Sequence, residues 1–255
     1  MKHHEIKFKN QDYNYSILIG KNTLNSLPSK LKSLCPKTKN IALIIDKKIP
    51  QKFRKNLSNK LKSYNLLFLP FLASEKNKSI NTVNYYLKIL LSKKFNRSDL
   101  IIAIGGGITG DVAGFIASIF KRGINFINIP TTLLAQSDSC IGSKSSINSG
   151  NIKNILGTFT PPKQIILDVS FLKTLEEKDI YSGIGEMIKV HAINSPESFD
   201  QINQSYEKIL EDPESMEQFI RASLIFKKRL IELDEFDVGP RNVMNYGHSF
   251  GHAIE

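Results

Sequence analysis

The feature that most constrains the fold is an apolar run that ends in three glycines. Residues 100–104 are apolar at every position, which is typical of a strand buried on both faces of a parallel sheet. Gly105, Gly106 and Gly107 follow directly, and a helical pattern with small side chains runs from Val112 to Phe120. A strand, a glycine turn and a helix start aim free backbone N–H groups at a phosphate. The stretch therefore predicts an α/β fold with a phosphate site.

The glycine turn alone does not identify its ligand. Gly105, Gly107 and Gly110 match G-x-G-x-x-G, but the dinucleotide fingerprint also expects an acidic residue after the next strand. Here that strand, residues 125–129, is followed by Pro-Thr-Thr and no acid, so a tight structural turn remains an alternative interpretation. Asp46 stands upstream, at the end of a buried strand over residues 40–45, where it is placed to accept hydrogen bonds from a ribose. A turn or helix N-cap aspartate would give the same pattern.

Length and composition are those of an ordinary globular chain. The 255 residues allow one large domain or two smaller ones, and 41% of them are hydrophobic. We find neither an apolar run long enough to span a membrane nor the apolar core of a signal peptide. Cys35 and Cys140 stand alone, which favours a reducing compartment. We therefore expect a cytoplasmic protein with no membrane segment.

The net charge of +11 raises the possibility of a nucleic-acid partner. The lysines, however, are scattered through the first hundred residues, and no basic motif with interleaved aromatic residues accompanies them. This distribution favours charges on solvated faces, so we expect no nucleic acid as a partner. A basic active site for an anionic small molecule agrees with the same charge.

The remaining pattern predicts alternating strands and helices, followed by helices alone. We expect a hairpin over residues 5–20, strands over 40–46, 66–69, 100–104, 125–129 and 164–168, and helices over 24–34, 51–64, 80–94 and 112–120. Residues 148–154 are predicted to form a polar loop. Beyond residue 176 the pattern is helical, over 176–194, 197–210, 213–236 and from 241 onward. This predicts a Rossmann-like domain with a parallel sheet over residues 1–165 and an all-α domain over 166–255.

A few side chains toward the C-terminus have the spacing of functional groups. His248 and His252 are four residues apart on a predicted helix, so they share a face that could bind a metal, although surface or core histidines would show the same spacing. Glu186 and Lys189 are three apart, which is usually a surface ion pair, yet the glycines and apolar residues around them are not typical of a solvated face. The basic residues Lys144, Lys153, Lys227 and Arg241 would each, taken singly, be surface charges.

Taken together, nine stretches in order resemble the 3-dehydroquinate synthase family of sugar-phosphate cyclases. They cover most of the chain, at residues 74–78, 105–111, 122–123, 130–138, 141–144, 153–157, 171–174, 185–189 and 245–255. The resemblance implies a carbon–oxygen lyase of the shikimate pathway that depends on NAD and on a divalent metal, zinc or cobalt. It would convert 3-deoxy-D-arabino-heptulosonate 7-phosphate to 3-dehydroquinate and release phosphate. It also implies a homodimer.

The same resemblance assigns roles to individual residues. NAD would be held by residues of the first domain and its boundary: Asp46, Glu75, Lys78, Gly106, Gly107, Asp111, Thr131, Thr132, Asp138, Lys144, Lys153, Phe171 and Thr174. Glu186 and His248 would bind the metal. Substrate contacts and catalysis would involve Lys144, Asn154, Lys189, Lys227, Arg241, Asn245 and His252, with Arg122 reaching a phosphate across the dimer interface.

Some positions depart from the family pattern. Ser143 and Ser145 replace the usual Gly and Thr around Lys144, Pro240 replaces a Leu, and Asp237 replaces a Glu. The family's third metal ligand, a histidine, would lie beyond residue 255, so we expect this chain alone to bind zinc weakly and to have little activity. Three alternatives stay open: another cyclase of the family, for example one acting on sedoheptulose 7-phosphate; a metal-dependent NAD alcohol dehydrogenase; and a non-catalytic remnant.

Overall fold

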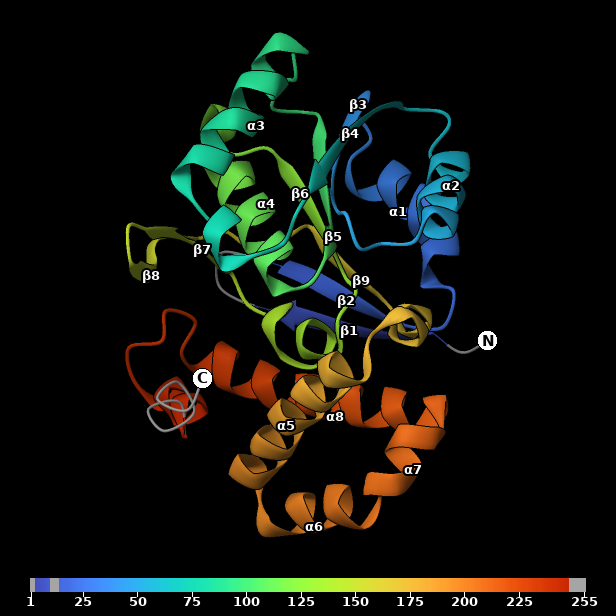
Figure 1. The fold of residues 1–255 in the computed structure, drawn as a ribbon, viewed down its shortest axis with the longest axis vertical. Coiled ribbons are helices and arrows are strands. Elements are labelled where there is room, and N and C mark those ends of the chain that lie inside the picture. Colours follow the sequence, from blue (N-terminus) through green and yellow to red (C-terminus); the bar gives the residue numbers. More distant parts are fainter. Residues whose placement is uncertain (1–2, 10–13, 248–255) are drawn as a thin grey trace.

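A single twisted sheet forms the centre of the protein, for which we obtained a computed structural model that describes residues 3–9 and 14–247 (Figure 1). Its order is β1-β2-β9-β6-β5-β3-β4. Only the β1–β2 pair is antiparallel, and the other neighbours run parallel. The strands are β1 His4–Lys9, β2 Asn14–Gly20, β3 Asn40–Asp46, β4 Asn65–Phe71, β5 Leu100–Gly105, β6 Asn125–Pro130 and β9 Gln164–Asp168. The predicted parallel sheet is confirmed, and the first hairpin joins it through β9.

Helices cover both faces of this sheet, which explains why its central strands are apolar throughout. In β3, Ile41, Leu43 and Ile45 belong to the core under α1 (Leu27–Leu34) and α2 (Gln51–Lys60). The alternate residues Ala42 and Ile44 face α3 (Ile80–Ser92) and α4 (Gly107–Ile119). Because successive side chains of a strand point to opposite faces, both sets are buried only when each face is covered.

The C-terminal part consists of helices that pack against the β1–β2–β9 side of the sheet. They are α5 Glu177–Asn194, α6 Pro196–Gln204, α7 Tyr206–Glu211 and α8 Pro213–Leu233. Their core includes Ile184, Met187 and Leu224, which share one cluster with Ile17 and Leu167 of the sheet. Figure 1 shows these helices gathered below the sheet, on the side opposite α3. The predicted succession of an α/β part and a helical part is therefore confirmed.

The structure differs from the sequence prediction at four elements. The helix predicted from Val112 begins at Gly107, because glycine's low helix propensity hides its first turn. The helix predicted over 197–210 is split at Ser205 into α6 and α7. Residues 148–154 are not a loop but belong to a hairpin of β7 (Lys144–Ser149) and β8 (Ile152–Phe159), and the largely exposed β8 carries no regular apolar alternation. Pro240–Asn245 forms a 3₁₀-helix rather than the start of an α-helix.

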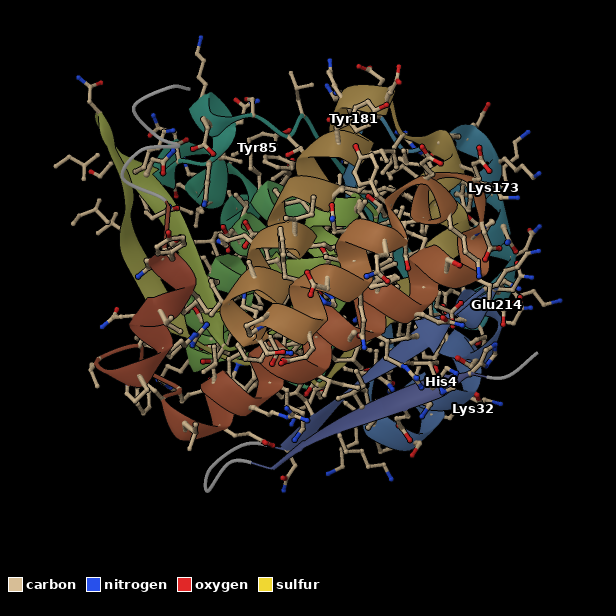
Figure 2. The ribbon with its side chains drawn as sticks, turned by 90° about the horizontal axis from the view of Figure 1, so that it is seen from below. His4, Lys32, Tyr85, Lys173, Tyr181 and Glu214 are labelled. Atoms are coloured by element: carbon tan, nitrogen blue, oxygen red, sulfur yellow. The ribbon has the colours of Figure 1, made fainter. Side chains whose placement is uncertain are left out.

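Several lysines of the N-terminal part lie on solvated faces. Lys32, Lys37, Lys39 and Lys47 are all exposed, and Figure 2 shows Lys32 and Lys173 projecting outward at the rim of the molecule. The interpretation of scattered surface lysines is therefore supported by their placement. Among the described residues, we find no helix with the length and apolar character needed to cross a membrane.

Candidate active site

The glycine turn lies at the carboxyl end of β5, where α4 begins. Gly106 is the N-cap of α4, with φ −75°, so this glycine is not required by a left-handed backbone. The space around it is tight: a Cβ at Gly106 would lie 3.0 Å from the side chain of Thr132, and one at Gly107 would lie 2.9 Å from that of Ser139. The turn is thus pressed against the segment that follows β6. It leaves the first N–H groups of α4 at the sheet edge, as an anion site requires.

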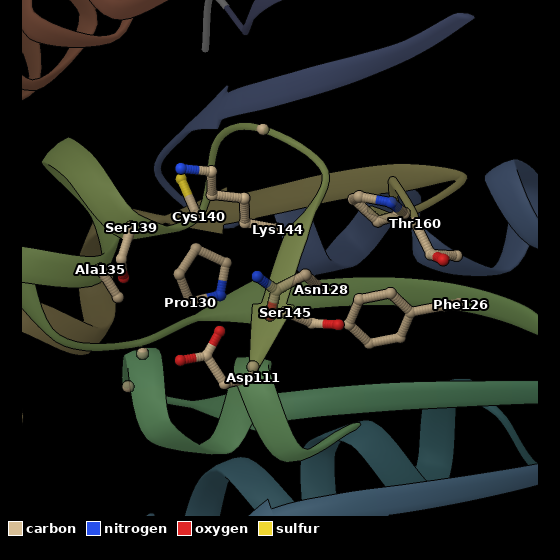
Figure 3. A pocket seen from close by; sticks show the side chains of 15 residues that line it. Asp111, Phe126, Asn128, Pro130, Ala135, Ser139, Cys140, Lys144, Ser145 and Thr160 are labelled. Carbon is tan, nitrogen blue, oxygen red and sulfur yellow. The ribbon is translucent and has the colours of Figure 1, made fainter. Parts of the chain in front are cut away.

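A cavity of about 30 Å³ opens beside this turn (Figure 3). Polar side chains from four segments line it, among them Asp111 of α4, Asn128 of β6, Ser139 and Lys144. The Cys140 thiol also lines it, and burial raises the pKa of that thiol to about 12, so it stays protonated at neutral pH. The cavity therefore offers charged and hydrogen-bonding groups together at the carboxyl edge of the sheet, where α/β proteins bind ligands.

A buried lysine connects the glycine-turn helix to the β7–β8 hairpin. Lys78 Nζ lies 2.6 Å from Asp111 Oδ2 and donates a hydrogen bond of 2.5 Å to Asn154 Oδ1. Ser146 Oγ donates to the same Asn154 oxygen at 2.9 Å. Burial raises the pKa of the Asp111 carboxyl, and the neighbouring Lys78 ammonium offsets part of this rise. Three residues predicted to serve one site are thus brought into direct contact.

The amide of Asn148 holds the hairpin against the segment that carries Glu75. Its Nδ2 donates to the Glu75 carboxylate at 2.8 Å and to the Glu75 carbonyl at 3.1 Å. Its Oδ1 accepts from the Asn154 backbone N–H at 2.9 Å, and its own N–H donates to the Lys78 carbonyl at 2.8 Å. Asn154 has φ 57°, a left-handed conformation that this contact helps to fix. Through its side chain and its backbone N–H, Asn148 therefore orders Glu75, Lys78 and Asn154 together.

Three further predicted residues lie at the carboxyl ends of β3 and β6. Asp46 is 8% exposed, and its carboxylate accepts a hydrogen bond of 2.9 Å from the Lys48 N–H, as in a turn aspartate. The Thr131 N–H donates to the Gly105 carbonyl at 2.9 Å, which fixes β6 beside the glycine turn. Thr132 Oγ1 accepts from the Ala135 N–H at 3.2 Å. These contacts place all three at the same sheet edge as the cavity.

Two lysines reach carboxylates on other elements. Asp138 lies in a π-helical turn over Ala135–Ser139, a distortion that often marks functional sites. Lys227 of α8 donates to Asp138 Oδ1 at 2.5 Å and to its carbonyl at 3.0 Å, and is 8% exposed. Lys144, at the start of β7, pairs with Asp237 Oδ2 at 2.5 Å. These two ion pairs join the α/β part to the helical part.

Glu186 and Lys189 form the expected ion pair on α5, at 2.6 Å. Their side chains are only 17% and 16% exposed, so the pair does not lie on a solvated face. Helix α5 approaches the site closely: a Cβ at Gly183 would lie 2.5 Å from the Leu133 side chain. Within residues 3–9 and 14–247, no three His, Cys, Asp or Glu side chains gather as a metal group. His248 and His252 lie outside the described residues.

Several predicted site residues are not in contact with this cluster. Arg122 is exposed and lines a second cavity with Arg97 and Lys163, beyond the amino end of β6. Lys153 is exposed on β8, and Asn245 is exposed and donates to Asn242 Oδ1 at 3.5 Å. Two more residues belong to the 3₁₀-helix Val169–Thr174: Phe171 is buried and stacks on Phe53, and Thr174 Oγ1 donates to the Phe171 carbonyl.

Comparison with known proteins agrees with this arrangement. The family model of the 3-dehydroquinate synthase N-terminal region matches residues 69–182, and that of the C-terminal region matches residues 183–255. The 3-dehydroquinate synthase of Pelagibacter ubique (strain HTCC1062) is 41% identical over 252 residues, which cover 98% of this chain and 68% of that protein. The chain belongs to the 3-dehydroquinate synthase family. A relative from Saccharolobus solfataricus with the same name is 39% identical, covering 94% of this chain and 65% of its own.

Several solved structures resemble this member of the 3-dehydroquinate synthase family. A 2-deoxy-scyllo-inosose synthase complexed with carbaglucose-6-phosphate, NAD⁺ and Co²⁺ is 25% identical, with a TM-score of 0.87 over 98% of this chain and 70% of that one. An iron-containing alcohol dehydrogenase from Thermococcus thioreducens shares the fold alone, at 17% identity and a TM-score of 0.67 over 86% of this chain and 65% of that one.

Two site residues of this family member escaped the sequence analysis. Asn128 lines the cavity from β6. The signal that could have identified it is its polar side chain between the apolar residues Ile127 and Ile129. Asn148 organises the hairpin, but in the sequence it is one of several asparagines in a polar stretch, so nothing distinguished it. A residue that acts through hydrogen bonds to distant segments leaves no local pattern. Its function becomes visible only when the strands are paired.

Proposed function

We propose that this chain catalyses the 3-dehydroquinate synthase reaction, in which 3-deoxy-D-arabino-heptulosonate 7-phosphate gives 3-dehydroquinate and phosphate. The observation that carries the proposal is the 41% identity to a 3-dehydroquinate synthase across 98% of the chain. The site supports it, because cationic side chains gather beside a glycine turn, as an anionic sugar phosphate requires. We further propose that residues 1–165 carry the cofactor and that residues 166–255 carry the metal and most substrate contacts.

The residues present fit NAD. The glycine turn carries no side chains, so a pyrophosphate can approach its backbone and the first N–H groups of α4. Asp46 ends β3 at the same sheet edge, where a carboxylate can accept hydrogen bonds from a ribose. When bound, NAD would supply reversible oxidation of a substrate hydroxyl. In this proposal Glu75 and Lys78 lie on one side of the turn and Asp138 on the other.

For a divalent metal we propose Glu186 and His248 as ligands. Glu186 is largely buried on α5, and its carboxylate already lies beside the Lys189 ammonium. A bound divalent cation would polarise substrate oxygens as a Lewis acid. His248 lies outside the described residues.

The chain's own cations would bind and orient the substrate. Lys144, Lys227 and Arg241 come from three elements, and Arg241 and Lys227 are more than nine-tenths buried. Charges held in such a protein environment stabilise developing anions more strongly than they would in water. Lys189 would add a fourth cation from α5. These groups would hold the substrate carboxylate and hydroxyls, while Asn154, with His252, would contact its phosphate region.

For Arg122 we propose a role between subunits of a homodimer. It lies beyond the amino end of β6, whereas the glycine turn follows the carboxyl end of β5. An arginine so placed would contact a phosphate of a partner's site more readily than one at its own glycine turn. The sugar-phosphate substrate and a second copy of the chain are the partners that we propose.

The test is turnover with two substrates. Purified protein with NAD and an excess of Zn²⁺ or Co²⁺ should release phosphate from the heptulosonate phosphate and form a cyclic product, without net accumulation of NADH. We expect a low rate, because the family's third metal ligand would lie beyond residue 255. Release only from sedoheptulose 7-phosphate would instead assign another cyclase reaction, and net NADH formation would assign a dehydrogenase. Absence of phosphate release from either substrate, with both cofactors shown to be bound by titration, would refute cyclase activity for this chain.

A further inference from the structure

One position that departs from the family pattern, Ser143, contacts a short segment that contains two others, Asp237 and Pro240. Ser143 is 1% exposed, and its Oγ donates a hydrogen bond to Glu235 Oε1. The next residue, Lys144, pairs with Asp237 at 2.5 Å. Glu235 and Asp237 lie in the segment between α8 and the 3₁₀-helix that contains Arg241. Two adjacent residues, Ser143 just before β7 and Lys144 at its start, thus contact Glu235 and Asp237 of this segment.

The segment is already ordered from within by one carboxylate. Asp234 accepts hydrogen bonds from the backbone N–H groups of Val238 at 3.0 Å, of Gly239 at 2.8 Å and of Arg241 at 3.2 Å. Asp237 has φ 58°, a left-handed conformation that aspartate tolerates better than most residues. The segment is therefore a compact turn. Contacts with residues outside the segment must therefore fix its position relative to the sheet.

Arg241 depends directly on that position. Its Nη1 donates to the Glu235 backbone carbonyl at 2.8 Å, so the guanidinium follows wherever Glu235 is held. Its Nη2 lies 3.3 Å from the point that a Cβ at Gly142 would occupy, which places it against the loop before β7. The Gly142 N–H donates to Tyr15 Oη at 2.9 Å, and this anchors the loop to β2. Arg241 is thus enclosed between Gly142 and Glu235.

We propose that Ser143 is a positioning residue, which through the Glu235 carboxylate holds the 234–241 segment and so orients Arg241 toward an anionic substrate. The substrate part rests on the function proposed above. A serine stands here where the family resemblance leads us to expect glycine, and glycine has no side chain to donate this hydrogen bond. The neighbouring Lys144–Asp237 ion pair is a second contact that holds the same segment against β7. Both tethers connect the α/β part to the helical part.

The test compares Ser143→Gly with Ser143→Thr in the full chain. Glycine restores the usual family residue and removes the donor, whereas threonine keeps a hydroxyl. Hydrogen–deuterium exchange of residues 234–241 should rise at least fivefold in Ser143→Gly, with β5 unchanged, and should stay within twofold of the parent protein in Ser143→Thr. Unchanged exchange in Ser143→Gly would overturn the tether, whatever the substrate is.

A binding measurement tests the consequence for Arg241. By calorimetry with NAD present, the Kd of 3-deoxy-D-arabino-heptulosonate 7-phosphate should rise about tenfold in Ser143→Gly and recover in Ser143→Thr, while the Kd of NAD stays unchanged. Parallel losses for both ligands would overturn the positioning role and leave a general packing role. If exchange rises as expected but the parent protein does not bind the heptulosonate phosphate, the proposed function fails while the tether stands.

Discussion

The close approach of α5 to the segment after β6 gives a sharp prediction. Gly183 faces Leu133 and Leu134 so tightly that an added Cβ would lie 2.5 Å from the Leu133 side chain and 2.8 Å from the Leu134 backbone nitrogen. Ordinary contact begins near 3.4 Å, so Gly183→Ala requires α5 to retreat by about 0.9 Å at this point. The backbone nitrogen cannot turn aside as a flexible side chain would, so the helix itself must move.

The magnitude follows from two opposing effects. Replacing glycine by alanine inside a helix favours folding by roughly 0.5–1 kcal/mol, and overpacking a tight contact costs about 1–3 kcal/mol. We expect Gly183→Ala to lower the free energy of unfolding by roughly 1–2 kcal/mol, or about 2–8 °C in Tm. A shift of this size also moves Glu186 and Lys189, so substrate affinity should fall about tenfold or more.

The same helix provides a matched control. Gly185 has no atom within 4 Å of its added Cβ, so Gly185→Ala should only add helix propensity and raise Tm by about 2–4 °C. Thermal unfolding of both variants by circular dichroism is the assay, with substrate titration beside it. Equal Tm changes of the same sign in the two variants would refute the argument that contact with Leu133 and Leu134 decides the outcome.

Other predictions test the hairpin, a strained turn and a buried histidine. Asn148→Ala removes side-chain hydrogen bonds to Glu75 and Asn154, so it should cost about 1–3 kcal/mol and raise the Kd of NAD roughly tenfold in a fluorescence titration; an unchanged Kd would contradict this. Lys121→Gly relieves a left-handed residue (φ 50°) and should raise the unfolding free energy by about 0.5–1 kcal/mol in urea, whereas a decrease would show that the turn is not strained. Burial lowers the pKa of His191 below its ordinary 6.5, so the unfolded chain binds the proton more readily and stability should fall as the pH drops below about 6.5. His191→Gln should flatten the slope of unfolding free energy between about pH 5 and 7, and an identical slope in both proteins would exclude this histidine as its source.

The sequence predicted those features that depend on local periodicity. The apolar run over residues 100–104 is β5, and the strand ending at Asp46 is β3, because full burial leaves the same pattern wherever both sheet faces are covered. The start of α4 at Gly107 and the β7–β8 hairpin were missed because glycine and exposed polar residues carry little periodic signal. The pairing of strands that bring Asn148 to Glu75 is non-local, so no window of sequence contains it.

For the candidate site too, the sequence indicated some residues and could not indicate others. The family motifs indicated Lys78, Asp111 and Asn154, and in the structure Lys78 contacts both of the others. Their roles toward NAD and substrate stay predictions. The π-helical turn around Asp138 and the contact from Ser143 to Glu235 depend on how the helical part packs against the sheet, which no residue pattern specifies.

The paired cations have a consequence for selectivity. Lys78, Lys144, Lys227 and Lys189 each lie 2.5–2.6 Å from a carboxylate of the chain itself. If these lysines bind the substrate as proposed, an incoming anion would displace a carboxylate of the chain, and its binding would gain only the difference between two ion pairs. A lone phosphate would compete at a single pair and gain little, whereas a molecule with a carboxylate and a phosphate at fixed separation would compete at several together. The proposed site would therefore select for the spacing of charges.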